Sequence, residues 1–216
     1  MENVRKGKGL EKGGFNNKAE LDAAHVPQWF IDSCLKIGYL FPRAHAVAYV
    51  MMAFRIAWFK VYQPLAYYAA YFTIRAEGSF NAPVILKGLE SQKAELARIA
   101  ALEHSTAVEK GNATVIEVAA EMYLRGMEFL PIDLDRSDAS EFKMVDGKLL
   151  PPFNCIPALG DAVAKEIVRA RGEHLFTSKE DLKKRGKVSQ SIIDTMDSMG
   201  ILKNMPDEEQ ISLFSF

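Results

Sequence analysis

The chain has 216 residues, of which 49% are hydrophobic and 25% are charged, and its formal net charge is −1. This length is enough for one large or two small domains with a real core, and the composition excludes a largely disordered chain. A near-neutral charge excludes nucleic-acid binding through a global positive field, so any such contact must come from local basic patches. Cys34 and Cys155 lack metal-site spacing and lie among apolar residues, which indicates reduced core thiols in a cytoplasmic protein.

Helical patterns dominate the first half of the chain. Residues 1–24 are polar and rich in glycine and lysine, and we expect a loop or mobile arm there. Pro27 suits the first turn of a helix. From Ala44 to Tyr62 apolar residues recur at helical spacing, which predicts a long helix that Gln63-Pro64 ends. A second apolar helix is predicted from Leu65 to Arg75.

The apolar run from Ala44 to Tyr62 also raises the question of a membrane span. Arg55 and Lys60 interrupt it, and each charge at a bilayer centre costs about 2.5–3.5 kcal/mol on insertion scales. We therefore expect a buried core helix and no membrane partner.

The second half begins with more polar helices and a hairpin. Helices are predicted from Pro83 to Lys110 and from Thr114 to Arg125. The runs Glu141–Val145 and Lys148–Leu150 flank Asp146-Gly147, and that dipeptide between two short runs is a strong β-hairpin signal.

Three short helices should follow, over Asp161–Arg171, Lys179–Lys184 and Gln190–Met199, with Ser178 and Ser189 as N-caps. The predicted fold is thus mainly α with one small β-hairpin.

The segment Ile156–Gly160 leads directly into a predicted helix and has the layout of a helix-hairpin-helix unit. A tight turn that feeds a helix N-terminus directs backbone N–H groups outward, where a DNA phosphate can bind without base contacts. The alternative is an ordinary turn before a helix. A Cβ at Ala158, where glycine is usual, should strain the turn by roughly 1 kcal/mol if φ is positive. The candidate DNA contacts here are Ala158, Leu159, Gly160, Lys165, Arg169 and Arg171, with the three basic residues on the outward side of the helix.

A second unit of the same kind is predicted over Gly186–Gln190, which adds Gly186, Lys187 and Ser189 as candidate DNA contacts. Paired units can bind both strands of a duplex. A basic cluster falls between the two turns: Lys179, Lys183, Lys184, Arg185 and Lys187. The alternative for this cluster is an ordinary solvated face.

Two further segments are candidate binding sites. Phe41, Arg43, His45 and Tyr49 surround the start of an apolar helix, where a cation, an imidazole and a phenol suit a triphosphate; the alternative is a buried histidine–tyrosine pair. At the C-terminus, Gln210, Leu213 and Phe214 form a peptide that can insert into a preformed groove, or else a frayed end.

The sequence offers no metal site and no catalytic residue of its own. It has no P-loop, no zinc spacing and no acidic cluster after a strand that holds two Mg²⁺ ions. Asp133 and Asp135 are interpreted as solvated turn residues.

Several segments resemble the PolC-type α subunit of bacterial DNA polymerase III, a family C replicative polymerase. They are Val4–Leu10, Val26–Cys34, Phe41–Tyr49, Tyr68–Arg75 and Leu149–Phe153. The resemblance covers the whole chain and implies three functional parts. Residues 1–130 correspond to the later part of the helical fingers, 131–205 to a β-hairpin plus tandem helix-hairpin-helix domain, and 206–216 to a flexible sliding-clamp-binding tail.

The resemblance also implies roles and partners. Phe41, Arg43, His45 and Tyr49 would line the nucleotide side of the active site, and Gln210, Leu213 and Phe214 would bind the clamp. The expected partners are duplex DNA, the incoming deoxynucleotide, the sliding clamp and the remaining polymerase domains. The palm carboxylates that hold Mg²⁺ in this family lie outside the chain, so we expect a fragment that binds no cofactor and is inactive alone. The alternative is a stand-alone DNA-binding or clamp-associated adaptor.

Overall fold

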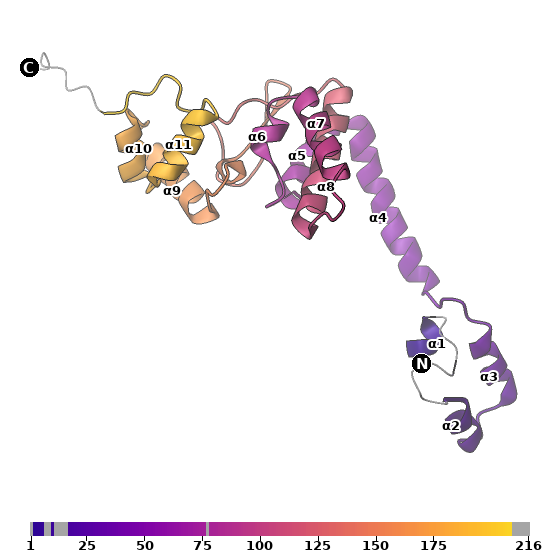
Figure 1. Cartoon of the computed structure of the whole chain (residues 1–216). Coiled ribbons are helices and arrows are strands. Elements are labelled where there is room, and N and C mark those ends of the chain that lie inside the picture. Colours follow the sequence, from indigo (N-terminus) through magenta and orange to yellow (C-terminus); the bar gives the residue numbers. More distant parts are fainter. Residues whose placement is uncertain (1, 7–9, 11–16, 77, 209–216) are drawn as a thin grey trace, which may run out of the picture. The chain divides into compact units, whose positions relative to one another are not determined.

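The computed structural model describes residues 2–6, 10, 17–76 and 78–208, which fold into helices and one small sheet (Figure 1). The chain divides into two compact units, residues 1–58 and 59–216, and each is described by itself. The predicted clamp residues Gln210, Leu213 and Phe214 lie outside the described residues.

The first unit begins with three short helices. They are α1 (Glu2–Arg5), α2 (Asn17–Ala23) and α3 (Gln28–Leu35). The predicted helix is present as α3, with Pro27 at its N-cap, one residue before the first turn in which the sequence placed it. The loop expected over residues 1–24 is wrong where α1 and α2 form, because apolar side chains from this polar segment join a small buried cluster. Its members are Val4, Leu10, Ile31 and Cys34.

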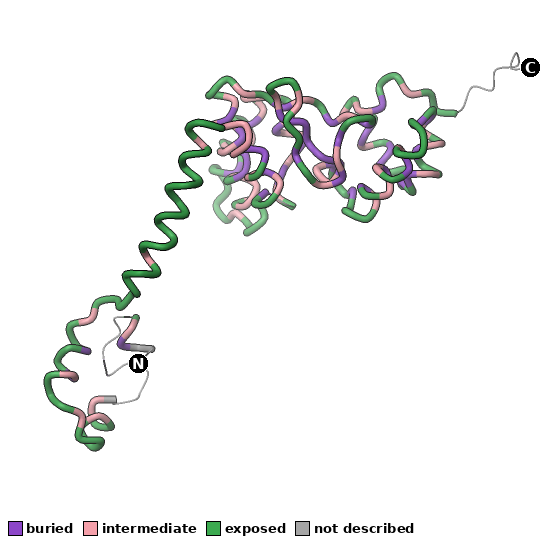
Figure 2. The backbone as a smooth tube through the Cα atoms, turned by 180° about the vertical axis from the view of Figure 1, so that it is seen from behind, coloured by how far each residue is buried: buried purple, intermediate pink, exposed green. Residues whose placement is uncertain are grey.

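The long apolar run forms α4 (Arg43–Tyr62), as predicted, but none of its residues is buried. Phe54 is 75% exposed and Trp58 is 51% exposed, and the tube of α4 is exposed along nearly all its length (Figure 2). The expectation of a buried core helix is therefore wrong within the described chain. Helical spacing determines that a helix forms, whereas burial requires a partner surface, and the described residues leave every residue of α4 at least partly exposed. By length and composition alone α4 could also cross a membrane, which for a single helix is weak evidence.

The second unit starts with a group of helices in which one prediction is wrong. The helices are α5 (Pro64–Ile74), α6 (Ala82–Ile85), α7 (Leu89–Ala100) and α8 (Ala107–Leu124). The single helix predicted from Pro83 to Lys110 is interrupted at Gly88, whose φ of 95° is incompatible with a helix. Helix α8 begins well before the predicted Thr114, because Thr106 and Glu109 form a capping box.

The β-hairpin is confirmed, with β1 (Lys143–Val145) and β2 (Lys148–Leu150) paired antiparallel so that Met144 faces Leu149. Asp146 and Gly147 both have positive φ, 51° and 76°, as a type I′ turn requires. Leu149 of β2 also hydrogen-bonds the main chain of Glu128 and Leu130.

The chain then forms a short 3₁₀ turn and three helices. They are η1 (Phe153–Cys155), α9 (Asp161–Glu173), α10 (Lys179–Arg185) and α11 (Gln190–Ser198). The three predicted helices are confirmed, and Ser178 and Ser189 cap α10 and α11 as expected.

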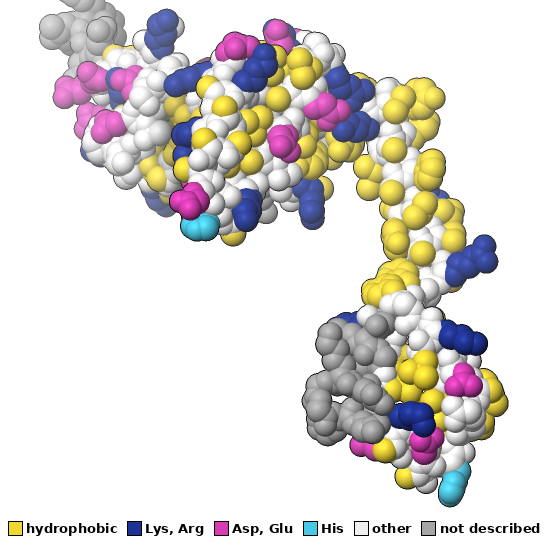
Figure 3. Space-filling view, turned by 45° about the vertical axis from the view of Figure 1, so that its right-hand side comes forward, with side chains coloured by type: hydrophobic (Ala, Val, Ile, Leu, Met, Phe, Trp, Pro, Cys, Tyr) yellow, Lys and Arg dark blue, Asp and Glu magenta, His cyan; other side chains and the backbone are white. Residues whose placement is uncertain are grey.

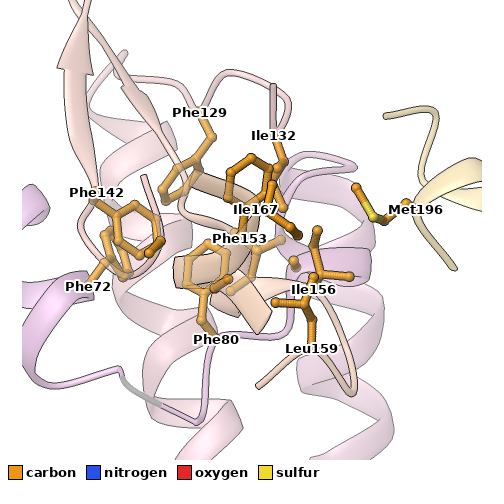
Figure 4. Close-up of a cluster of buried hydrophobic side chains, with 14 of the residues drawn as sticks. Phe72, Phe80, Phe129, Ile132, Phe142, Phe153, Ile156, Leu159, Ile167 and Met196 are labelled. Carbon is orange, nitrogen blue, oxygen red and sulfur yellow. The ribbon is translucent and has the colours of Figure 1, made fainter. Parts of the chain in front are cut away.

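One hydrophobic core runs through the second unit, from Tyr68 in α5 to Leu202 after α11. Figure 4 shows its phenylalanine centre, where Phe72 packs edge-on against Phe80 and Phe129 with ring centroids 5.5 and 5.2 Å apart. Ile156 and Leu159 of the first hairpin belong to the same core. These two side chains anchor the turn of the first helix-hairpin-helix unit, Ile156–Gly160, to the core of the second unit. The functional boundary near residue 130 stays a prediction.

Candidate nucleic-acid interface

The two predicted hairpins adopt the same backbone path despite different sequences. Ala158 and Lys187 occupy the left-handed region, with φ of 64° and 53°. Each is followed by a buried apolar residue and then by a helix N-cap, Gly160 with φ −79° and ψ 159° and Ser189 with φ −72° and ψ 158°. The strain expected for Ala158 applies, since its φ is positive. Two equivalent turns therefore lead into α9 and α11.

Gly160 and Gly186, the glycines of the two hairpins, differ in whether the fold leaves room for a side chain. Gly160 is exposed, its φ is ordinary, and a Cβ there would meet no atom within 4 Å. Gly186 is buried, and a Cβ there would lie 2.7 Å from the carbonyl oxygen of Leu182. The fold thus requires glycine at 186 but not at 160, and the exposed Gly160 leaves room for close approach from outside.

The basic side chains near the hairpins are partly neutralised. Arg169 donates to both oxygens of Glu166 at 3.0 Å and to Glu173 at 2.6 Å. The ammonium of Lys187 lies 3.0 Å from Glu166, so α9 and the second hairpin are linked. The guanidinium of Arg169 and then the ammonium of Lys187 lower the pKa of Glu166 to about 2. Lys165 is exposed beside them. Asp161 in the first turn of α9 adds a third carboxylate, which is exposed, near these three cations. The surface is therefore nearly balanced in charge, which suits weak phosphate binding that relies on backbone N–H groups.

Two arginines of the predicted basic surface are structural instead. Arg171 donates to the carbonyl oxygens of Leu134 and Ser137 at 2.9 and 2.8 Å and lies over the Phe153 ring. The expectation that Arg171 points outward is therefore wrong, because these loop carbonyls need a donor and the end of α9 brings the guanidinium to them. Arg185 likewise donates to Asp181 and to main-chain oxygens of Ala170 and His174.

The remaining lysines of the basic cluster lie along α10. Lys183 donates to the side chain of Gln190, the first residue of α11, at 3.0 Å. Lys184 is exposed, and Lys179 forms ion pairs with Asp197 and Asp207. The cluster therefore adjoins the second hairpin. On the face of the molecule drawn in Figure 3, basic and acidic side chains are interspersed.

A cleft of about 490 Å³ lies beside the first hairpin, between Phe80, Asn112 and Asn154 on its walls and Ala158 and Gly160 at its edge. All of the side chains that line it are uncharged. It therefore offers no counter-charge to a phosphate, and the hairpin backbone remains the candidate anion contact.

The first unit brings the predicted nucleotide-side residues together. The Phe41 ring lies 5.2 Å from His45 and 6.0 Å from Tyr49, and His45 lies 5.7 Å from Tyr49. All three are exposed within the described chain, so the buried histidine–tyrosine alternative is not found there. Arg43 is exposed as the first residue of α4. Sequence reasoning missed Tyr39, which stacks on Phe41 at 5.9 Å; its position two residues before Phe41 was the available signal.

The described residues include no group of three His, Cys, Asp or Glu side chains that could hold a metal ion. Asp133 accepts from the main-chain N–H groups of Asp135 and Arg136 and from the Arg136 side chain. The Asp133 carboxylate thus accepts hydrogen bonds from within its own turn. The donor set within the described chain does not fit a two-metal centre.

Comparison with known proteins agrees with this geometry. A family model described as a helix-hairpin-helix motif matches residues 126–211. Proteins named DNA polymerase III PolC-type are 50% identical to this chain over 214 residues in Thermotoga maritima, 52% over 216 in Pediococcus pentosaceus and 51% over 217 in Listeria monocytogenes. Each alignment covers 99% of this chain and 15% of the relative, so the chain spans a small part of those proteins. Nearly the whole chain is therefore homologous to a segment of the PolC-type DNA polymerase III family, and it carries the helix-hairpin-helix motif within that segment.

Proposed function

We propose that the helix-hairpin-helix region binds duplex DNA through phosphates, without reading sequence, as part of a replicative polymerase. One observation carries this proposal: two turns of the same backbone path lead into α9 and α11, and the exposed Gly160 has no structural need to be glycine. Helix N-termini that begin in such turns present free N–H groups to anions. Lys165 and Lys187 supply nearby charge.

The direct test is duplex binding by the full chain, measured by fluorescence anisotropy with two duplexes of unrelated sequence. Phosphate contacts carry no base information, so the two affinities should agree within about twofold. A strong preference for one duplex would contradict the proposal. A single strand of the same length serves as the control for binding by charge alone.

The exposed surface of α4 supports membership of a larger polymerase. A stand-alone adaptor would leave residues such as Met51 and Phe54 in water, whereas large apolar patches usually mark an interaction surface. We propose that the remaining polymerase domains cover α4, and that the parent enzyme works in the cytoplasm. The adaptor would be favoured if the gene region lacked any palm-encoding sequence.

We also propose that the cluster of Phe41, Arg43, His45 and Tyr49 faces the incoming deoxynucleotide in that larger enzyme. It supplies a guanidinium, an imidazole and a phenol at the N-terminus of a 20-residue helix, a combination suited to a triphosphate. Binding of a deoxynucleotide by the parent enzyme should weaken on Arg43→Ala and much less on Arg55→Ala. Equal effects would contradict the role of Arg43.

Two further roles rest on sequence. Gln210, Leu213 and Phe214 are proposed to bind the sliding clamp, and pull-down should be lost in the Gln210→Ala, Phe214→Ala double variant. Mg²⁺ is proposed to bind carboxylates of a palm domain, and the chain alone is proposed to be inactive. Nucleotide incorporation by the purified chain would contradict that inactivity.

A further inference from the structure

A groove of about 540 Å³ adjoins α10 and is lined by charged groups of both signs. Three lysines (Lys179, Lys183 and Lys184) and Glu180 line it from α10, and Asp207 and Glu208 line it from the segment that follows α11. The described chain thus places its acidic linker against the basic cluster.

Specific contacts hold the linker there. The main-chain N–H of Lys179 donates to the Pro206 carbonyl at 2.9 Å, and that of Glu180 donates to the Asp207 carbonyl at 3.0 Å. The ammonium of Lys179 lies 3.0 Å from the Asp207 carboxylate. Asp207 first and Asp197 second raise the pKa of Lys179. Two backbone bonds and an ion pair define one docked position for residues 206–208.

The two partners of this ion pair differ in their exposure. The Lys179 side chain is 21% exposed, whereas that of Asp207 is 87% exposed. The lysine is therefore fixed in the groove wall, partly by Asp197 at 3.1 Å. The Asp207 carboxylate lies on the outer side, where another anion can replace it in the ion pair at little cost, since exposed ion pairs are weak. Displacement of the whole linker also breaks the two backbone hydrogen bonds.

The groove is continuous with the second hairpin. Gln190 lines the groove and is also the first residue of α11, directly after the N-cap Ser189. The Lys183 ammonium donates a hydrogen bond to the side-chain oxygen of Gln190 at 3.0 Å. If one phosphate of a DNA strand lies at the second hairpin, a neighbouring phosphate of that strand would therefore lie near Lys183. The linker lines the same groove.

We propose that residues 206–208 occupy this groove in the free chain as an acidic linker, and that duplex phosphates displace this linker when DNA binds. The proposal rests on the proposed duplex binding. Its consequence is a coupling in which DNA changes the attachment of the segment that leads into the predicted clamp peptide. The acidic linker acts as an internal competitor that weakens binding of DNA to the free chain.

The test compares two double variants of the full chain with the same change in net charge. Asp207→Asn with Glu208→Gln neutralises the linker, and Glu141→Gln with Asp146→Asn neutralises two exposed carboxylates near the β-hairpin turn. Asparagine suits position 146, where φ is 51°. Duplex affinity is measured by anisotropy, and hydrogen exchange of the Lys179 and Glu180 amides is measured with and without a saturating duplex.

The linker variant should bind duplex about threefold more tightly than the control variant, the size expected for one exposed ion pair. In the wild-type chain, the Lys179 and Glu180 amides should be protected when free and exchange faster with DNA. Equal affinities of the two variants together with unchanged protection would overturn the linker proposal and leave duplex binding intact. No duplex binding by the wild-type chain would overturn both proposals.

Discussion

Replacing Gly160 by glutamate places a carboxylate where a DNA phosphate is proposed to lie. Gly160→Gln is the matched control, because it adds a side chain of the same size without the charge. Both substitutions should leave the fold intact, since φ is −79° and a Cβ would meet no atom within 4 Å. The difference between the two variants therefore isolates the effect of charge.

The size of this difference follows from the exposure of the hairpin. Two unit charges about 4 Å apart interact with roughly 1 kcal/mol in bulk water and about 4 kcal/mol at an effective dielectric constant of 20. Because Gly160 is exposed, the lower part of this range applies. A repulsion of about 1–2 kcal/mol should weaken duplex binding roughly 5- to 30-fold relative to the glutamine variant.

The assay combines duplex titration with denaturant unfolding of the same two proteins. A carboxylate at the N-terminus of α9 interacts favourably with the helix dipole, so Gly160→Glu should be at least as stable as Gly160→Gln while binding DNA more weakly. Stability and affinity thus move in opposite directions. Equal affinities would refute the phosphate site at this hairpin, and parallel losses of stability and affinity would refute the reasoning that separates them.

Three other substitutions test the structural assignments. Gly186→Ala should destabilise the chain by about 1–3 kcal/mol in denaturant unfolding, because its Cβ would lie 2.7 Å from a main-chain oxygen; unchanged stability would contradict this. Arg171→Met should lower the free energy of unfolding by about 1–3 kcal/mol, because two carbonyls lose their donor; a loss of DNA affinity without a loss of stability would instead restore Arg171 as a phosphate contact. Phe54→Lys should weaken association of the chain with the remaining polymerase domains in sedimentation experiments, since Phe54 is 75% exposed on an apolar helix; unaltered association would show that α4 is not the contact surface.

Local sequence signals predicted the elements whose causes are local. The Asp146-Gly147 turn, the N-caps Ser178 and Ser189, and the helix that starts after Pro27 all depend on a few neighbouring residues, and all are present. The left-handed φ of Ala158 was also foreseeable from its place in the hairpin.

Features that depend on partners distant in sequence were not predictable in this way. The apolar spacing of α4 indicates a helix but does not indicate which surface covers it. The inward orientation of the Arg171 side chain depends on the carbonyl groups of Leu134 and Ser137, which are distant in the sequence. The docking of Asp207 on Lys179 likewise depends on how the chain returns to α10.

In the candidate site, too, locally determined features were predicted and those that depend on distant partners were not. Sequence predicted both hairpins and the cluster around Phe41, because these are contiguous motifs. It did not predict that Glu166 would join Arg169 and Lys187, and so it overestimated the positive charge that is free for DNA.

The salt dependence of duplex binding by the full chain tests the central claim most directly. If about three phosphates are neutralised, the slope of log K against log salt should be near −2.7, and affinity should fall about 40-fold between roughly 50 and 200 mM salt. The same slope should be found for duplexes of unrelated sequence. An affinity that stays flat over this range would contradict the claim that the paired hairpins bind DNA through its phosphates.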